Sequence, residues 1–105
     1  MKNETKHPAH AMFARNIVEL NIDSLKIRLS LILKKIIEDN MWTQTSAAEN
    51  LGVTQPRISN LCNSRLEKFS VESLLEMTIR AGYEFDLRFA PNNEAMPLEI
   101  GIRKT

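Results

Sequence analysis

Hydrogen-bonding side chains gather in residues 54–60 of this 105-residue chain. The amide of Gln or Asn pairs with adenine through two hydrogen bonds, and the guanidinium of Arg does so with guanine. Gln55 and Arg57 are therefore the best candidates for contacts with base edges, and Ser59 and Asn60 are further candidates. These residue types in one short segment indicate recognition of double-stranded DNA in its major groove.

A second group of polar residues is suited to phosphate oxygens rather than to bases. Gln44 stands at the expected start of the preceding helix, where its side chain and the helix N-terminus together can hold a phosphate. The alternative for each of these residues is an ordinary polar position on the surface. The further candidates for phosphate contacts are Thr43, Thr54, Asn63, Ser64, Arg65 and Lys68.

Enzyme chemistry has little support in the sequence, which contains no Gly-rich phosphate loop, paired metal-ligand motif or nucleophile signature. His7 and His10 are interpreted as parts of a solvated tail rather than as metal ligands. Cys62 is interpreted as a small, buried or half-buried hydrophobic residue. Trp42 is interpreted as a core residue rather than a platform on which a base stacks. We therefore expect no catalysis, no cofactor and no metal.

Two short helices joined by a tight turn are predicted to position the candidate DNA contacts. Helices that cross steeply need a small side chain where their backbones approach, and Ala48 supplies one. The turn needs a residue that tolerates a positive φ, which Gly52 does without a Cβ clash. The apolar residues expected to form the seam between the helices are Ala47, Leu51, Val53, Ile58 and Leu61.

Capping residues mark where the helices should begin and end. Thr43 is placed to cap the first helix of the pair, and Thr54 the second, in whose first turn Pro56 costs no intrahelical bond. Ser70 is placed to cap one more helix. Asn40 tolerates a left-handed conformation, which suits the end of the helix before the pair.

A longer helix is expected before the pair, with Asp23 or Ser24 as its N-cap. Residues 12–20 are expected to form a separate short helix or a docking arm. Ile27 and Leu31 lie opposite the main apolar face of the long helix, so either the arm folds over them or they contact another protein. That main apolar face carries Leu25, Leu29, Ile32 and Ile36.

After Gly82 the hydrophobic period changes from 3.6 to 2. Apolar and charged residues alternate over residues 83–89, which predicts a half-buried strand. A weaker alternation over residues 98–103 predicts a second strand. A lone strand must find a partner. Either the two segments form a hairpin across residues 90–97, or the first strand pairs with its copy in a second chain.

Pairing between copies would make a homodimer. An antiparallel register centred on Leu87 would set Phe85 against Phe89 and Asp86 against Arg88, which are favourable cross-strand pairs. Two-fold symmetry would hold two recognition helices about 34 Å apart, so that they read half-sites one turn apart. The residues expected to dimerise are Tyr83, Phe85, Asp86, Leu87, Arg88 and Phe89.

The composition is that of one small globular domain, with 43% hydrophobic and 26% charged residues. A net charge of +1 excludes the strongly basic balance of a nonspecific nucleic-acid coat, while a specific binder with local charge remains compatible. A single cysteine allows no internal disulfide and fits a reducing compartment. No segment is suited to span a membrane. We expect a soluble, cytoplasmic protein.

Three parts are expected along the chain. Residues 1–11 should form a flexible tail and residues 12–82 a helical domain with an N-terminal arm. Residues 83–105 should form a C-terminal strand with an extension. The expected fold class is mainly α.

The segment 42–61, followed by Lys68-Phe69-Ser70 and Leu74-Leu75, resembles the Xre/Cro-type helix-turn-helix family. Within that family it is most similar to HigA-like antitoxins, which share the Gly-Val-Thr-Gln-Pro-Arg-Ile-Ser stretch. The resemblance covers residues 24–90. It implies a lambda-repressor-like bundle of four to five helices with a C-terminal strand. It also implies a homodimer that binds a palindromic operator, represses its own operon and neutralises a RelE-like toxin ribonuclease encoded next to it.

Carried over by position, the resemblance implies that Gln44 contacts phosphate, and that Gln55, Pro56, Arg57 and Asn60 face the groove. The chain departs from the family pattern at two positions. Ser64 stands where Gly is common, which bears on a phosphate contact, and Trp42 replaces the usual Leu.

Two other functions remain as alternatives. The chain could be a stand-alone or phage-type regulator without a toxin partner. It could also be an interaction module without DNA binding that works through Ile27, Leu31 and the N-terminal arm.

Overall fold

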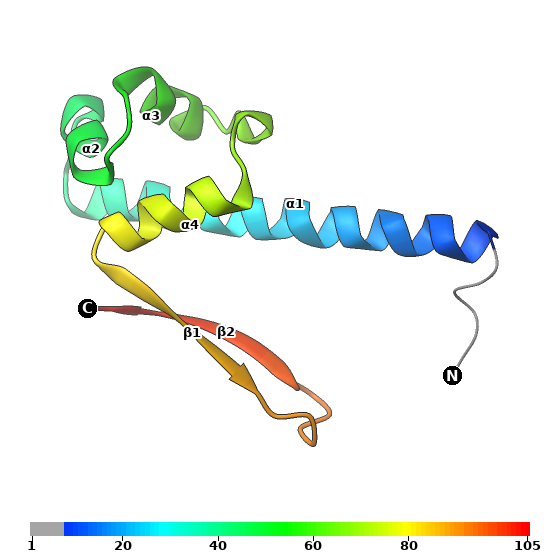
Figure 1. The fold of residues 1–105 in the computed structure, drawn as a ribbon. Coiled ribbons are helices and arrows are strands. Elements are labelled where there is room, and N and C mark those ends of the chain that lie inside the picture. Colours follow the sequence, from blue (N-terminus) through cyan, green and yellow to red (C-terminus); the bar gives the residue numbers. More distant parts are fainter. Residues whose placement is uncertain (1–7) are drawn as a thin grey trace.

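The computed structural model describes the backbone of residues 8–105 and the side chains of residues 18–105. Within this part the fold is mainly helical and ends in a two-stranded sheet, which confirms the expected class (Figure 1). Residues 8–11 of the predicted tail, which was residues 1–11, are helical instead. Residues 1–7, with His7, lie outside the described residues, as does the side chain of His10. The elements are α1 (Pro8–Asp39), α2 (Gln44–Leu51), α3 (Gln55–Cys62), the 3₁₀ helix η2 (Leu66–Lys68), α4 (Val71–Arg80), β1 (Tyr83–Phe89) and β2 (Leu98–Lys104).

α1 is one continuous helix of 32 residues, so the predicted N-cap at Asp23 or Ser24 is wrong. No Pro or Gly stands between residues 9 and 39, and residues of middling helix propensity alone do not end a helix. A segment that continues the helix cannot fold back over it. The predicted separate arm at residues 12–20 is therefore also wrong, and Ile27 and Leu31 stay exposed.

α1 ends as one turn unwinds after Asp39. The side-chain amide of Asn40 donates to the carbonyl of Ile36 at 2.8 Å. The left-handed residue is Met41, with φ 54°, and not Asn40 as predicted. The chain then turns into α2, where the hydroxyl of Thr43 accepts the backbone N–H of Ser46 at 3.1 Å.

The turn between α2 and α3 has the predicted form. Gly52 adopts φ 71° and ψ 33°, and its N–H donates to the carbonyl of Ala48. The seam residues predicted from spacing lie in or against a single core, to which α1 and α4 contribute. The buried hydrophobic residues of this core are Leu29, Leu33, Ile36, Ile37, Ala47, Ala48, Leu51, Ile58, Leu61, Phe69, Leu74 and Met77.

α4 begins with a capping box. Ser70 accepts the N–H of Ser73 at 3.0 Å, and Ser73 accepts the N–H of Ser70 at 3.1 Å. Two buried hydroxyls are satisfied within their own helices: Thr78 donates to the carbonyl of Leu74, and Ser30 to that of Ile27. Gly82, with φ 98°, then redirects the chain into β1.

β1 and β2 form an antiparallel hairpin, the first of the two alternatives that the alternation left open. Leu87 lies opposite Ile100 of its own chain, and Phe85 lies opposite Ile102. The predicted register, centred on Leu87 and shared with a second copy, is therefore not the pairing of this strand. The physical reason is that residues 90–97 close a hairpin locally, so the strand finds its partner without a second chain.

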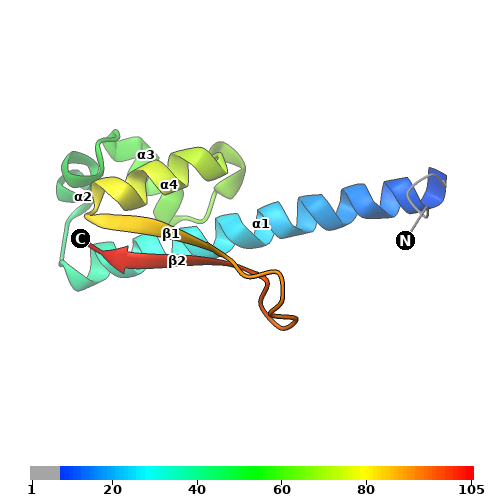
Figure 2. The ribbon, with the colours of Figure 1, turned by 60° about the horizontal axis from the view of Figure 1, so that its bottom comes forward.

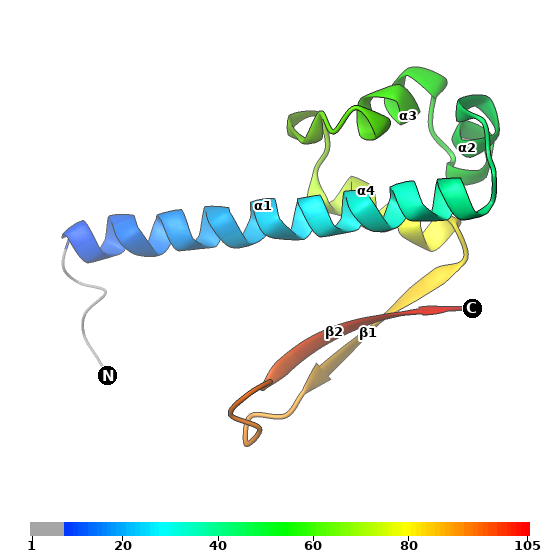
Figure 3. The ribbon, with the colours of Figure 1, turned by 180° about the vertical axis from the view of Figure 1, so that it is seen from behind.

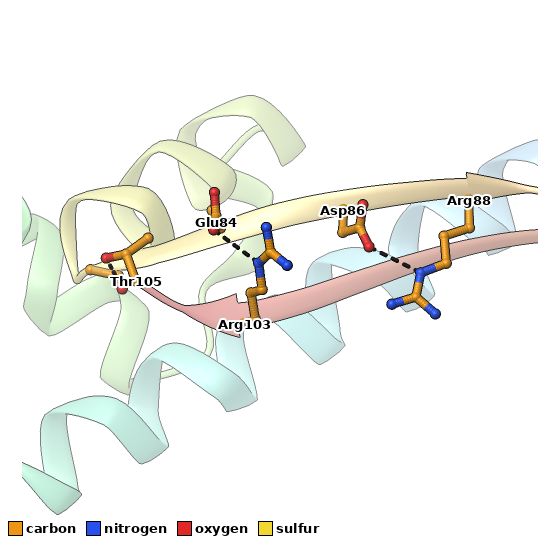
Figure 4. Close-up of polar contacts among 6 residues, drawn as sticks. Glu84, Asp86, Arg88, Arg103 and Thr105 are labelled. Carbon is orange, nitrogen blue, oxygen red and sulfur yellow. Dashed lines mark hydrogen bonds and ion pairs between the residues drawn. The ribbon is translucent and has the colours of Figure 1, made fainter.

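The two faces of the hairpin differ in polarity. Charged residues on one face pair with one another: Arg103 Nε contacts Glu84 at 2.9 Å, and Arg88 Nε contacts Asp86 at 3.0 Å (Figure 4). The hydrogen bond that Arg88 donates to the Asp86 carboxylate raises the pKa of Arg88 above its usual value. The other face is apolar. Only its end near α4, with Tyr83 and Phe85, packs against the core.

The elements are arranged around α1 and α4. α2 and α3 lie on one side of these two helices, and the hairpin lies on the other (Figures 1 and 3). The N-terminal half of α1 extends beyond the bundle (Figure 2). No helix in the described part of the chain is long and apolar enough to cross a membrane.

Candidate nucleic-acid interface

α3 has one buried face and one polar face. Ile58 and Leu61 are fully buried, and these two side chains fix the orientation of the helix on the core. At 100° per residue, the face opposite this buried pair carries Pro56 and Asn63 at its centre. Ser59 and Asn60 lie on either side of that centre. The structure thus brings these predicted DNA contacts together on one outward face. A polar helix face of this kind is suited to the major groove.

Gln44 and Gln55 lie side by side although they are eleven positions apart in the sequence. Each is the first residue of its helix, and Gln55 Nε2 donates to Gln44 Oε1 at 2.7 Å. Both side chains are exposed. The bond leaves the second N–H of Gln55 and the amide N–H groups of Gln44 free to donate. One predicted base contact and one predicted phosphate contact are thus joined at the point where the two helix N-termini meet.

Arg57 does not extend away from the domain. Its guanidinium carbon lies 4.4 Å from the centre of the Phe69 ring, and its Nη1 donates to the carbonyl of Lys68 at 3.3 Å. The side chain is half-buried on the flank of α3, next to the buried face. These contacts give Arg57 a structural role that its place in the sequence did not indicate. Its predicted contact with guanine stays a prediction.

The loop after α3 carries the remaining basic candidates. Arg65 and Lys68 are exposed, and Asn63 is the C-cap of α3. Ser64 has φ 59°, the left-handed conformation that glycine adopts at no steric cost. Its hydroxyl accepts a hydrogen bond from Lys34 Nζ. Ser64, at the position where Gly is common, therefore adopts a left-handed conformation and adds a side-chain contact to α1.

The two predicted threonine caps differ. Thr43 uses its hydroxyl to cap α2, whereas the hydroxyl of Thr54 makes no cap hydrogen bond in α3. Thr54 is exposed beside Gln55, so its hydroxyl is available to a phosphate oxygen. Two threonines with similar sequence contexts therefore differ: Thr43 caps its helix, whereas Thr54 keeps its hydroxyl available.

Cys62 and Trp42 lie outside the group of candidate DNA contacts. Cys62 is exposed, so its interpretation as a buried or half-buried residue is wrong. It is the last residue of α3. Trp42 is half-buried and packs against the core, as predicted.

Phe69 is the residue that sequence reasoning missed at this site. It is almost fully buried, and one face of its ring carries the guanidinium of Arg57. The pairing spans twelve residues and depends on how η2 turns the chain back toward α3. No local pattern in the sequence signals such a contact. Among the described residues no group of three or more His, Cys, Asp or Glu could hold a metal ion.

Comparisons with known proteins agree with this geometry. A family of helix-turn-helix domains matches residues 16–89. A solved structure described as an XRE-family transcriptional regulator is 32% identical in sequence, with a TM-score of 0.62. That similarity covers 71% of this chain and 86% of the other. A search among curated proteins gives no match. The chain therefore belongs to the XRE-type helix-turn-helix family of DNA-binding transcriptional regulators.

Proposed function

We propose that this protein is an operator-specific repressor that binds a palindromic DNA site as a homodimer. The observation that carries the proposal is the polar outward face of α3, oriented by the buried Ile58 and Leu61. Placed in the major groove, this face presents Ser59 and Asn60 to base edges. The N-termini of α2 and α3, joined through Gln44 and Gln55, would lie against the phosphate backbone.

The contacts divide into two kinds. Gln55 and Asn60 would read bases, since an amide can pair with adenine. Phosphates would be held by residues whose exposed groups surround that face, where they set affinity rather than specificity. These residues are Thr43, Gln44, Thr54, Asn63, Arg65 and Lys68.

The DNA-binding part of the proposal is tested with Asn60→Ala and the DNA upstream of the gene. The side-chain amide of Asn60 makes no hydrogen bond within the described residues, so its removal should leave stability unchanged. If Asn60 reads a base, affinity for the operator should fall by about 1–3 kcal/mol, or roughly 5- to 150-fold. Fluorescence anisotropy at fixed salt measures this.

Asn92→Ala is the matched control, because Asn92 is an exposed amide in the hairpin turn, remote from α3. It should bind the operator as the unaltered protein does. Equal losses in both variants, or none in Asn60→Ala, would remove Asn60 from the base contacts. Retention of the unaltered chain on DNA that does not weaken as salt rises would contradict the whole proposal.

We further propose that the protein is the antitoxin of a toxin-antitoxin pair and represses its own operon. The resemblance to HigA-like antitoxins supports this role. The test is to express the chain together with its neighbouring small gene and purify it through a tag on the chain. A tight complex with a basic, RelE-like ribonuclease, and loss of the ribonuclease activity within it, is the expected result. A regulator without a toxin partner would purify alone.

A further inference from the structure

An apolar groove runs between the middle of α1, residues 21–32, and the hairpin. It has a volume of about 690 Å³, and its apolar lining consists of Leu25, Leu29 and Ile32 from α1 and Leu98, Ile100 and Ile102 from β2. The three residues from β2 are between 36% and 57% exposed. The hairpin, which forms one wall of the groove, lies on the side of α1 and α4 opposite α2 and α3 (Figure 1). The groove therefore takes no part in the candidate DNA face.

The α1 side of the groove belongs to one long stripe. Val18, Ile22, Leu25, Leu29, Ile32 and Ile36 follow one another at alternating spacings of four and three residues, the pattern of the seam between paired helices. The C-terminal part of the stripe is buried in the core of this chain, whereas Val18, Ile22 and Leu25 are exposed. Within the described residues, the exposed first half of the stripe has no apolar partner.

We propose that the groove binds the α1 helix of a second copy of this chain, antiparallel to its own. A two-fold interface needs a surface that is complementary to itself. Leu25 meets this condition, because it lines the groove and also belongs to the stripe that would enter the partner's groove. With the two-fold axis between Asp23 and Ser24, Ile22 of each copy lies against Leu25 of the other.

Charge supports the antiparallel direction. Glu19 and Lys26 lie on the same flank of the stripe, seven residues or about two helical turns apart. Two antiparallel helices face each other along like flanks, so each Glu19 would meet the Lys26 of the other copy. The antiparallel arrangement that pairs these opposite charges also places the apolar residues of the two stripes against each other.

A standard interface buries roughly 800 Å² on each partner, so it needs apolar surface beyond the groove itself. The apolar face of the hairpin, with Leu87 at 68% and Phe89 at 72% exposure, extends the groove on the far side of the incoming helix.

The inference deepens the proposed function, since a palindromic operator needs a two-fold protein, but its test needs no DNA. Sedimentation velocity of the full chain should give twice the chain mass of 12.0 kDa. Leu25→Glu would bury charged groups at the seam and should raise the dimer dissociation constant by roughly 100-fold or more. Ile100→Glu, on the other wall of the groove, should act in the same direction.

Leu31→Glu is the matched control. Leu31 is a leucine of the same helix, 57% exposed, but it points away from the stripe. It should leave the dimer intact. A chain that sediments as a monomer, or equal weakening by Leu25→Glu and Leu31→Glu, would overturn the inference. Far-UV circular dichroism and thermal melting verify that each variant is folded.

Charge reversal tests the direction without altering the apolar surface. Glu19→Lys alone and Lys26→Glu alone should each weaken the dimer several-fold, and the double variant should restore it. A double variant no tighter than either single one would overturn the antiparallel register. A dimer that binds the operator and that Leu25→Glu and Ile100→Glu leave intact would contradict this inference alone, because the proposed function requires a dimer but not this interface. A stable dimer without DNA affinity would contradict the proposed function alone.

Discussion

Gly52 is held in the left-handed region of φ, which glycine adopts with less strain than any other residue. With φ 71°, it closes the turn between α2 and α3, and a Cβ there would lie 2.9 Å from Cδ of Arg80. The small residue was expected at this turn from spacing alone. Its contact with α4, which comes from a distant part of the chain, was not.

Gly52→Ala should lower the free energy of unfolding by about 1–2 kcal/mol, because an L-residue pays this much in the left-handed region. Urea denaturation followed by circular dichroism measures it. Gly101→Ala is the control, because its φ is not in the left-handed range and its Cβ would meet no atom closer than 3.9 Å. A Gly52 variant no less stable than the Gly101 variant would contradict the strain argument.

Arg57 is expected to contribute to stability as well as to DNA binding. Arg57→Ala removes the contact with the Phe69 ring and the hydrogen bond to the Lys68 carbonyl, which together should cost about 1 kcal/mol. Arg65→Ala, a more exposed arginine in the next loop, should change stability by less than about 0.5 kcal/mol. Chemical denaturation compares the two. Equal stabilities would show that the contacts of Arg57 carry no net energy.

At the scale of single elements, the helix ends show where local sequence determines structure and where it does not. Thr43 and Ser70 cap their helices with side-chain hydrogen bonds, as their positions predicted, and Thr54 stands at a helix start without one. α1 shows the opposite case. Asp23 and Ser24 are good cap residues, yet the helix passes through them because nothing nearby ends it.

Ser70→Ala should therefore cost about 1 kcal/mol of stability, the usual value of an N-cap hydrogen bond. Thr54→Ala should cost less, because the Thr54 hydroxyl accepts no bond from its helix. If Thr54 contacts phosphate, its variant should instead weaken DNA binding. Thermal melting and anisotropy on both proteins separate the two roles. A larger loss of stability in Thr54→Ala than in Ser70→Ala would contradict the assignment.

At the scale of the whole molecule, function depends on where charge lies rather than on its sum. The net charge of +1 gives no reason to expect nucleic-acid binding, whereas Arg65 and Lys68 stand exposed beside the recognition helix. The hairpin lies on the opposite side of the molecule, and its charged face is satisfied by its own ion pairs (Figure 4). The candidate DNA face and the apolar groove therefore lie on separate surfaces.

Binding to the operator should weaken as salt rises, with a slope of about −0.9 in log–log form for each phosphate neutralised. Lys68→Ala should reduce that slope by about one unit for each recognition helix bound and weaken binding to all sequences alike. Anisotropy titrations at several salt concentrations measure the slope. An unchanged slope would remove Lys68 from the phosphate contacts.

The sequence alone determined the features that depend on neighbours along the chain. The starts of α2, α3 and α4, the turn at Gly52 and the apolar seam all follow from caps, periodicity and residue size within a few turns. The polar residues of α3 were identified for the same reason, since a helix with one buried face must expose the other.

Tertiary structure decided everything that joins distant segments. The contact of Arg57 with Phe69 depends on the path of η2, and the bond between Gln44 and Gln55 depends on the angle between two helices. Whether β1 pairs within its own chain or with a second copy depended on how residues 90–97 turn. Periodicity specifies which face of an element is apolar, but only packing in three dimensions specifies what that face meets.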